Sequence, residues 1–337
     1  MVADMLHRPV RDLRISVTDR CNFRCTYCMP FDDYVWFPTK ETLTFDEIAR
    51  VARAFVGLGV EKVRLTGGEP LLRANLEGLV RELSTIRGLQ ELCLTTNGSL
   101  LADKAESLRA AGLSRINVSL DTLDPAKFSR IRRRGDLSKV LEGIFAAKRA
   151  GLHPMKINAV IERGVNDDDI IPLVEFAREH GFSLRFIEFM DVGNANAWSW
   201  DRVVPKREII EMITSRFALR EVGREKGTAP SVTYEFEDGG GDVGIIASVS
   251  EPFCASCTRA RLTADGKVVT CLFSDVGHDI RSLLRDGASD EALSGAIASI
   301  WRVRTDRYSE ERLSAHETGA APQPGARRKL EMITLGG

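Results

Sequence analysis

The stretch Cys21-Asn22-Phe23-Arg24-Cys25-Thr26-Tyr27-Cys28 places three cysteines on one short loop, directly after an apolar segment typical of a β-strand. Three cysteines this close together suggest a metal centre to which the loop supplies an incomplete set of ligands. An electron-carrying four-iron cluster normally has four cysteine ligands, whereas the local supply here ends at Cys28. One iron would stay open to another ligand, as the open position of a catalytic zinc does. This pattern favours catalysis over electron storage.

Cysteines also bind zinc or form disulfides. A structural zinc site usually has four ligands, and disulfides fit poorly because nothing in the chain resembles a signal peptide. A second triplet, Cys254, Cys257 and Cys271, again supplies three cysteines, and Cys93 stands alone between the two sets. Two triplets and a singleton predict two metal sites. A zinc ribbon lacking its fourth cysteine is the alternative for the second triplet, and no ligand role is expected for Cys93.

The alternation of short apolar segments with amphipathic segments over residues 12–191 is typical of parallel βα units. Six such units are two short of a full barrel. We therefore predict an α/β fold with an incomplete six-unit (β/α) TIM-like barrel in residues 1–200 and a smaller C-terminal α+β extension in residues 201–337. The expected barrel strands are 13–17, 62–66, 91–95, 115–120, 155–161 and 184–189, and the expected helices are 45–58, 76–86, 103–111, 137–150 and 168–180. In the extension we expect strands at 234–236, 243–247 and 268–272 and helices at 281–285 and 291–303.

One face of most predicted barrel strands is polar, because successive side chains on a strand point to opposite faces. A full barrel would fill its interior with branched apolar residues. A polar interior instead predicts a cavity that holds a large polar ligand. The sixth strand is less clear, since Arg185 shares its face with Ile187 and Phe189. The polar positions are Arg14, Ser16 and Thr18; Lys62, Arg64 and Thr66; Thr95 and Asn97; Asn117, Ser119 and Asp121; and Lys156 and Asn158.

Composition excludes two classes of function. The chain of 337 residues has 47 Lys and Arg against 48 Asp and Glu, so it lacks the overall basic field of a generic nucleic-acid binder. No apolar run approaches the ~20 residues of a membrane span. We expect a cytoplasmic protein with no nucleic-acid or membrane partner, whose anionic ligands are bound by local clusters of cations.

Two further segments carry candidate chemistry. Gly67-Gly68-Glu69-Pro70 closes the second predicted strand, and its glycines would let the backbone approach a ligand. Taken alone, this segment would more often be a tight turn than a site. Arg259-Ala260-Arg261 puts two cations on one strand face, which suits a phosphate or a purine edge. By contrast, residues 132–134 are expected to form a solvated helix-linker face, and residues 319–328 to lack regular structure.

The first triplet, with an aromatic residue before its last cysteine, resembles the radical S-adenosylmethionine (SAM) superfamily. In that family the open iron of a 4Fe-4S cluster binds the methionine part of SAM. An electron from the cluster then cleaves SAM to a 5'-deoxyadenosyl radical. The resemblance implies cluster ligands at Cys21, Cys25 and Cys28 and SAM contacts at Tyr27, Gly68, Ser119 and Met190.

Both triplets, the Arg259-Ala260-Arg261 segment and the terminal Gly336-Gly337 together resemble the GTP 3',8-cyclase family, molybdenum cofactor biosynthesis protein A, over nearly the full length. The resemblance implies conversion of GTP to 3',8-cyclo-7,8-dihydro-GTP by hydrogen abstraction from ribose C3', the first step of molybdenum cofactor biosynthesis. It implies a second 4Fe-4S cluster at Cys254, Cys257 and Cys271 that coordinates the guanine. It assigns GTP binding to Arg14, Lys62, Arg64, Thr95, Lys156, Arg185, Arg259 and Arg261, and catalytic roles to Arg259, Arg261, Gly336 and Gly337.

The resemblance also implies partner proteins: a reductant such as flavodoxin or ferredoxin, and a downstream cyclic pyranopterin monophosphate synthase. The sequence leaves the oligomeric state open, a homodimer included. One alternative is a radical SAM enzyme with an auxiliary cluster that acts on a peptide or another small molecule, although it would usually carry a longer, more cysteine-rich extension. The other alternative, a two-cluster electron carrier or zinc-binding module, would not need SAM and would not explain the polar strand faces.

Overall fold

The structure, a computed structural model, describes residues 2–319 and 329–336. Its named strands form one mixed, 12-stranded sheet in the order β12-β11-β10-β1-β2-β3-β4-β5-β6-β9-β8-β7. The strands are β1 (Asp12–Ser16), β2 (Lys62–Thr66), β3 (Glu91–Thr96), β4 (Arg115–Ser119), β5 (Met155–Ile161), β6 (Ser183–Glu188), β7 (Leu219–Arg224), β8 (Val232–Phe236), β9 (Asp242–Ile246), β10 (Arg259–Leu262), β11 (Lys267–Val269) and β12 (His278–Asp279). The α-helices are α1 (Phe45–Leu58), α2 (Leu76–Ser84), α3 (Ala105–Ala110), α4 (Pro125–Arg132), α5 (Leu137–Arg149), α6 (Ile170–His180), α7 (Lys206–Thr214), α8 (Arg281–Arg285), α9 (Asp290–Arg302), α10 (Tyr308–Glu317) and α11 (Met332–Leu335).

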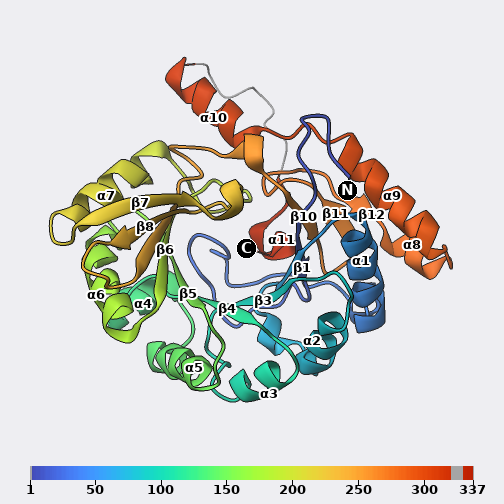
Figure 1. The fold of residues 1–337 in the computed structure, drawn as a ribbon, viewed down its shortest axis with the longest axis horizontal. Helices are drawn as coiled ribbons and strands as arrows, with labels where there is room; N and C mark the ends of the chain where they lie inside the picture. Colours follow the sequence, from blue (N-terminus) through green and yellow to red (C-terminus); the bar gives the residue numbers. More distant parts are fainter. Residues whose placement is uncertain (1, 320–328, 337) are drawn as a thin grey trace.

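The six strands β1 to β6 are parallel and lie side by side in chain order. Helices α1, α2, α3, α5 and α6 follow the outer side of this curved sheet, whereas α11 lies on the side that we call the inner face (Figure 1). The six expected strands are confirmed to within one residue at each end, and the five expected helices to within two. The sequence-based prediction missed α4, which begins with Pro125 and whose N-cap Asp124 accepts a hydrogen bond from the amide of Lys127.

The C-terminal part of the chain extends both edges of the parallel strands. Strand β9 pairs with β6 in parallel, and β10 pairs with β1 in parallel. The expected strand at 268–272 ends earlier, at Val269, so Cys271 lies beyond it. The sequence did not predict these edge pairings, which bring β10 and the cysteines around it beside the first strand.

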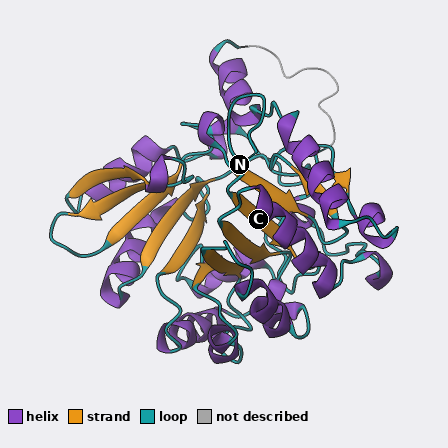
Figure 2. Ribbon diagram, turned by 45° about the vertical axis from the view of Figure 1, so that its right-hand side comes forward, coloured by secondary structure: helices purple, strands orange, loops and turns teal. Residues whose placement is uncertain are grey.

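The outer face of the sheet packs against the helices through apolar side chains, and Figure 2 shows the helices along that side. Leu13, Ile15, Val63 and Leu65 are fully buried there. Helix α1 begins with a capping box, in which the side chain of Thr44 accepts from the amide of Glu47 and the Glu47 carboxylate accepts from the amide of Thr44. Among the described residues, none of the helices has the length and apolar character of a membrane span.

Candidate active site

The first cysteine triplet lies on the loop that follows β1. The amides of Cys28 and Met29 donate to the carbonyl of Cys25, at 3.1 and 2.8 Å, and the amide of Phe23 donates to Sγ of Cys21 at 3.4 Å. Burial raises the pKa of the Cys21 thiol to about 12, and it raises the pKa values of the Cys25 and Cys28 thiols as well. The metal-free thiols are therefore protonated at neutral pH, and a metal that binds them must displace their protons.

Helix α4 braces this loop from one side. The two amides on either side of Cys25 each donate to a carbonyl in the last turn of α4, at 3.0 Å. In addition, Nη1 of Arg132 donates to Sγ of Cys25 at 3.0 Å. Arg132 is buried, so the prediction of a solvated face is wrong for this residue, whereas Arg133 and Arg134 are exposed. The reason is that the last turn of α4 faces the cysteine loop.

The glycine pair at the end of β2 packs directly against the chain before the cysteines. The amide of Gly68 donates to the carbonyl of Thr18 at 2.8 Å. A Cβ added at Gly68 would lie 2.3 Å from the carbonyl oxygen of Arg20, and one added at Gly67 would lie 2.6 Å from that of Thr18. Side chains do not fit at either position, so only glycine allows β2 to end against this loop.

Glu69 has a structural role in the same segment. Its carboxylate accepts hydrogen bonds from the amide of Leu71 at 3.0 Å, the hydroxyl of Thr96 at 2.7 Å and the amide of Asn97 at 2.7 Å. Burial outweighs these hydrogen bonds and raises the pKa of Glu69 to about 7. The carboxylate therefore ties the end of β2 to the end of β3.

The other predicted SAM contacts come from three different elements. Tyr27 belongs to the cysteine loop, and its hydroxyl donates to Asp121 at 3.0 Å. Ser119 is the last residue of β4, and Met190 follows β6. The side-chain amide of Asn196 joins two of these residues, because it donates to the carbonyl of Met190 at 2.8 Å and to that of Tyr27 at 3.5 Å.

Two asparagines on β4 and β5 give independent evidence that the inner face of the sheet binds a ligand. The side-chain oxygens of Asn117 on β4 and Asn158 on β5 are buried and accept no hydrogen bond from the part of the chain that the structure describes. Buried polar atoms are nearly always hydrogen-bonded. Both residues were predicted to line a polar cavity, and a polar ligand there would satisfy them.

Three arginines lie in register across neighbouring strands. Arg64 on β2 is opposite Arg14 on β1, and Arg14 is opposite Arg261 on β10. Burial lowers the pKa of Arg14, and repulsion from Arg261, Arg259 and Arg64 lowers it further. Burial and repulsion from Arg259 lower the pKa of Arg261 to about 10. Like charges directly opposite one another destabilise a sheet, so this row is suited to a bound polyanion.

A second pair of cations lies on β5 and β6. Burial, with repulsion from Arg185 and Arg115, lowers the pKa of Lys156 to about 7, and burial, with repulsion from Arg64 and Arg115, lowers the pKa of Arg185 to about 10. Both residues line a cavity of about 310 Å³. The cavity is also lined by Ser183, Arg224, Thr233 and Asp242.

Lys62 and Thr95 already have protein partners. Lys62 forms an ion pair with Glu91 at 2.9 Å, and the same carboxylate oxygen lies 3.0 Å from Arg115. The Thr95 hydroxyl accepts from Arg64 at 3.2 Å. The sequence-based prediction missed Arg115, although strand alternation places it on the same face as Asn117 and could have found it.

The second cysteine triplet lies around β10. Cys254 begins a short 3-10 turn, and its carbonyl accepts from the amide of Cys257 at 3.1 Å. Strand β10 pairs with β11 in an antiparallel hairpin, which brings the chain back before Cys271. The side chain of Arg259 donates to Sγ of Cys257 at 3.3 Å. Burial raises the pKa of Cys257, but Arg259 and Arg304 outweigh it and lower that pKa to about 6, whereas burial raises the pKa of Cys271 to about 12.

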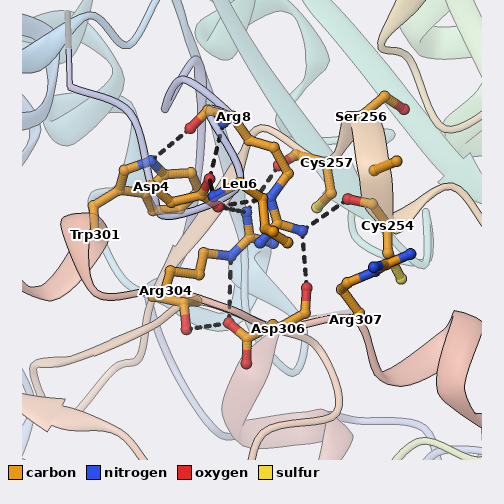
Figure 3. A network of polar contacts seen from close by, with 12 residues as sticks. Asp4, Leu6, Arg8, Cys254, Ser256, Cys257, Trp301, Arg304, Asp306 and Arg307 are labelled. Atoms are coloured by element: carbon orange, nitrogen blue, oxygen red, sulfur yellow. Dashed lines mark hydrogen bonds and ion pairs between the residues drawn. The ribbon is translucent and has the colours of Figure 1, made fainter.

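A buried ion network clamps the backbone of this triplet (Figure 3). Asp4 pairs with Arg8 at 2.6 Å and with Arg304 at 3.2 Å. Arg8 then donates to the carbonyl of Cys254 at 2.8 Å, and Arg304 donates to the carbonyl of Cys257 at 2.9 Å. The first residues of the chain thus hold cysteines that lie almost 250 positions away.

The described end of the chain reaches the inner face of the sheet through α11 (Figure 1). The carbonyl of Gly336 accepts from Arg261 at 2.8 Å. Gly336 has φ +68°, and a Cβ added there would lie 2.5 Å from Cγ2 of Thr66. Both its conformation and its surroundings therefore require glycine. The other predicted terminal residue, Gly337, lies outside the described residues.

The spacing of the cysteines bears on the kind of metal centre. Within residues 2–319 and 329–336, no three His, Cys, Asp or Glu side chains converge closely enough to hold a single metal ion. A structural zinc ion needs four ligands at roughly 2.0–2.3 Å. In a four-iron cluster each cysteine binds a different iron, so the sulfurs do not need to converge on one point. The donor set of each triplet fits such a cluster with one iron left open.

Two family models match this chain, and solved structures share its fold. Residues 15–177 match the Radical SAM superfamily, and residues 182–310 match Molybdenum Cofactor Synthesis C. The crystal structure of Streptococcus suis SuiB bound to S-adenosylmethionine has a TM-score of 0.59 at 17% identity, over 86% of this chain and 68% of that one. SuiB bound to its precursor peptide SuiA has a TM-score of 0.61 at 16% identity, over 91% of this chain and 67% of that one. These two likenesses concern the fold alone. The family match places the chain among radical SAM enzymes.

Curated relatives narrow the class further. Proteins named GTP 3',8-cyclase from Acidothermus cellulolyticus, Xanthomonas axonopodis pv. citri and Staphylococcus haemolyticus are 50%, 48% and 47% identical to this chain. The matches cover 99–100% of this chain and 98–99% of each relative. The chain belongs to the GTP 3',8-cyclase family.

Proposed function

We propose that this enzyme converts GTP to 3',8-cyclo-7,8-dihydro-GTP, the first step of molybdenum cofactor biosynthesis. The full-length likeness to relatives named GTP 3',8-cyclase supports the reaction. The observation in this chain that carries the proposal is the row formed by Arg64, Arg14 and Arg261, which joins the strand before the first triplet to the strand inside the second. Such a row is unfavourable by itself and becomes favourable around a triphosphate, because charge-assisted hydrogen bonds to Arg are strong.

A 4Fe-4S cluster and SAM are the cofactors of the radical SAM family to which the chain belongs. We assign the cluster to Cys21, Cys25 and Cys28. When bound, the cluster would supply the electron for reductive cleavage of SAM, which gives the radical needed to take hydrogen from ribose C3'. The chain's own part is to position SAM, through the backbone of Gly68 and through Tyr27, Ser119 and Met190.

The cations of the inner face would hold GTP by its phosphates and keep the ribose close to SAM. Fixing two reactants in one geometry lowers the barrier, because the entropy of bringing them together is lost on binding. Burial, together with repulsion from neighbouring cations, lowers the pKa values of Arg14 and Lys156, and a bound anion would relieve that repulsion. The proposed GTP-binding set is Arg14, Lys62, Arg64, Thr95, Lys156, Arg185, Arg259 and Arg261.

The second triplet, Cys254, Cys257 and Cys271, would hold a second 4Fe-4S cluster with its open iron on the guanine. The hydrogen bond from Arg259 to Sγ of Cys257 supports this, since it favours the thiolate that binds iron. We assign catalytic roles to Arg259, Arg261, Gly336 and Gly337. The hydrogen bond from Arg261 to the Gly336 carbonyl supports a link between the terminal residues and the substrate cations.

The wider architecture and the partners are part of the same proposal. Residues 1–200 would form an incomplete six-unit barrel, and residues 201–337 a C-terminal extension that completes the substrate side. The reductant would be a protein such as flavodoxin or ferredoxin. The product would pass to a cyclic pyranopterin monophosphate synthase.

The test is anaerobic turnover of the reconstituted full-length protein with SAM and a strong reductant, with and without GTP. Mass spectrometry would quantify 5'-deoxyadenosine and the modified nucleotide. We expect 5'-deoxyadenosine to form together with a cyclised GTP product. Cleavage of SAM that is indifferent to GTP would leave a radical SAM enzyme with another substrate, and no cleavage at full iron loading would favour an electron carrier.

A further inference from the structure

Arg132 is a buried cation that has no part in the assignments above. It is the last residue of α4 and is 3% exposed, and its Nη1 lies 3.0 Å from Sγ of Cys25. Its guanidinium also lies over the rings of Phe23 and Tyr27, at 5.9 and 5.6 Å from their centroids. A buried Arg that contacts a cysteine sulfur therefore lies directly beside the first triplet.

Asp121 holds this guanidinium in place. Its Oδ2 lies 2.8 Å from Nη2 of Arg132, and Asp121 is 1% exposed. The same oxygen accepts from the Tyr27 hydroxyl at 3.0 Å, and Oδ1 accepts from the amide of Val160 at 3.0 Å. Arg132 cannot turn away without leaving a buried carboxylate unpaired, which is strongly unfavourable.

The backbone fixes the distance between Arg132 and Cys25 as well. The amide of Arg24 donates to the carbonyl of Arg132, and the amide of Thr26 donates to the carbonyl of Ile131, both at 3.0 Å. These hydrogen bonds flank Cys25 on both sides. The contact between guanidinium and sulfur is thus held by the side chain of Asp121 and by the chain around the cysteine itself.

We propose that Arg132 is a positioning residue that holds Cys25 and makes the cluster on the first triplet easier to reduce. This inference rests on the radical SAM assignment of that triplet. On reduction, the cluster takes one electron from an external reductant and becomes more negative by one charge, while Arg132 keeps its proton. Hydrogen bonds to the ligand sulfurs help to set cluster potentials, and a fixed cation stabilises the more negative state.

The experiment uses the full chain with Cys254, Cys257 and Cys271 changed to Ala, so that only the first cluster is present. After anaerobic reconstitution, iron is quantified and the reduction potential is measured by titration followed by electron paramagnetic resonance. Arg132→Met/Asp121→Asn removes the buried pair together and leaves the net charge unchanged. We expect normal iron content and a shift to a more negative potential, because the member of the pair that contacts Sγ of Cys25 is the cation, whose hydrogen bond is lost. Arg132→Lys keeps the charge and should shift the potential less. Arg134→Met removes an arginine of the same run from an exposed position and should leave the potential unchanged.

A potential in the double variant that equals that of Arg134→Met would overturn the proposal. A shift in Arg132→Lys as large as that in the double variant would overturn it too, because the retained charge would then have no effect. Loss of iron from every Arg132 variant would show a structural brace and not a residue that sets the potential. By contrast, a parent protein that binds no iron at the first triplet, or whose cluster spectrum ignores SAM, would contradict the proposed function instead.

Discussion

The two cysteine triplets have the same number of ligands but different surroundings. Around the first triplet, Arg132 is paired with Asp121, and the pKa values of all three thiols are raised by burial. Around the second, Arg259 and Arg304 lower the pKa of Cys257 to about 6 against the effect of burial. The strand that carries Arg259 also carries Arg261, which joins the row of arginines.

The two sets of surroundings differ in charge, as the proposed function requires of two sites with different ligands. Buried, charge-balanced surroundings suit SAM, whose methionine part has both an amino group and a carboxylate. A site bordered by unbalanced cations suits a polyanion, because each cation gains a partner only when the ligand binds. The predictions below test this division of roles.

The largest effect should come from removing one ligand of each triplet in turn. We expect Cys25→Ala to abolish formation of both 5'-deoxyadenosine and cyclised GTP, because SAM would lose its cluster. We expect Cys257→Ala to abolish cyclised GTP while the first cluster still cleaves SAM. Mass spectrometry measures both products in both variants, and Cys93→Ala is the control. Equal loss of SAM cleavage in Cys25→Ala and Cys257→Ala would contradict the division of roles between the two triplets.

A smaller effect, on stability, should come from the buried ion network of Asp4, Arg8 and Arg304 beside the second triplet. Asp4→Asn removes the buried carboxylate that Arg8 and Arg304 share, although Arg304 keeps Asp306 at 3.3 Å. Breaking a buried pair in this way costs about 3–5 kcal/mol. The exposed pair of Arg53 and Glu82, 3.2 Å apart, gives a matched control, since Glu82→Gln should cost only about 0–1 kcal/mol. Urea denaturation of the metal-free protein measures both. Similar denaturation midpoints for the two variants would show that the ion pairs of Asp4 do not stabilise the fold.

The smallest effect is a pH dependence of GTP binding. The pKa of Lys156 in the free protein is lowered to about 7, so above pH 7 the side chain is mostly neutral. It must then take up a proton before it can form an ion pair with a phosphate of GTP. GTP affinity should therefore fall between pH 7.5 and 9, by at most about tenfold per pH unit. Isothermal titration calorimetry checks this, and Lys156→Arg, which stays charged, should flatten the profile. An equal slope in that variant would contradict the role of Lys156.

The sequence predicts the features that depend on neighbouring residues in the chain. The strands followed from alternation such as that of Leu13, Arg14 and Ile15, and the cysteine loop followed from its spacing. The alternation also placed the asparagine oxygens that the structure leaves without a partner among the described residues. The row of Arg64, Arg14 and Arg261 could not be predicted in full, because the pairing of β10 with β1 joins segments far apart in the chain.

The remaining features depend on contacts that no local pattern encodes. Asp4 and Arg304 are 300 positions apart, and neither lies in a recognisable motif. Arg132 was misread because a run of three arginines usually indicates a solvated surface. Whether such a residue turns inward depends on where α4 ends relative to the cysteine loop, and that is set by tertiary packing.

The division of roles between the triplets can be measured directly by electron paramagnetic resonance on two variants of the full chain. One variant has Cys21, Cys25 and Cys28 changed to Ala, and the other has Cys254, Cys257 and Cys271 changed to Ala. We predict that GTP, and not SAM, alters the cluster spectrum of the first variant, and that SAM, and not GTP, alters that of the second. A spectrum of the first variant that ignores GTP, or the absence of any cluster in it, would contradict the account.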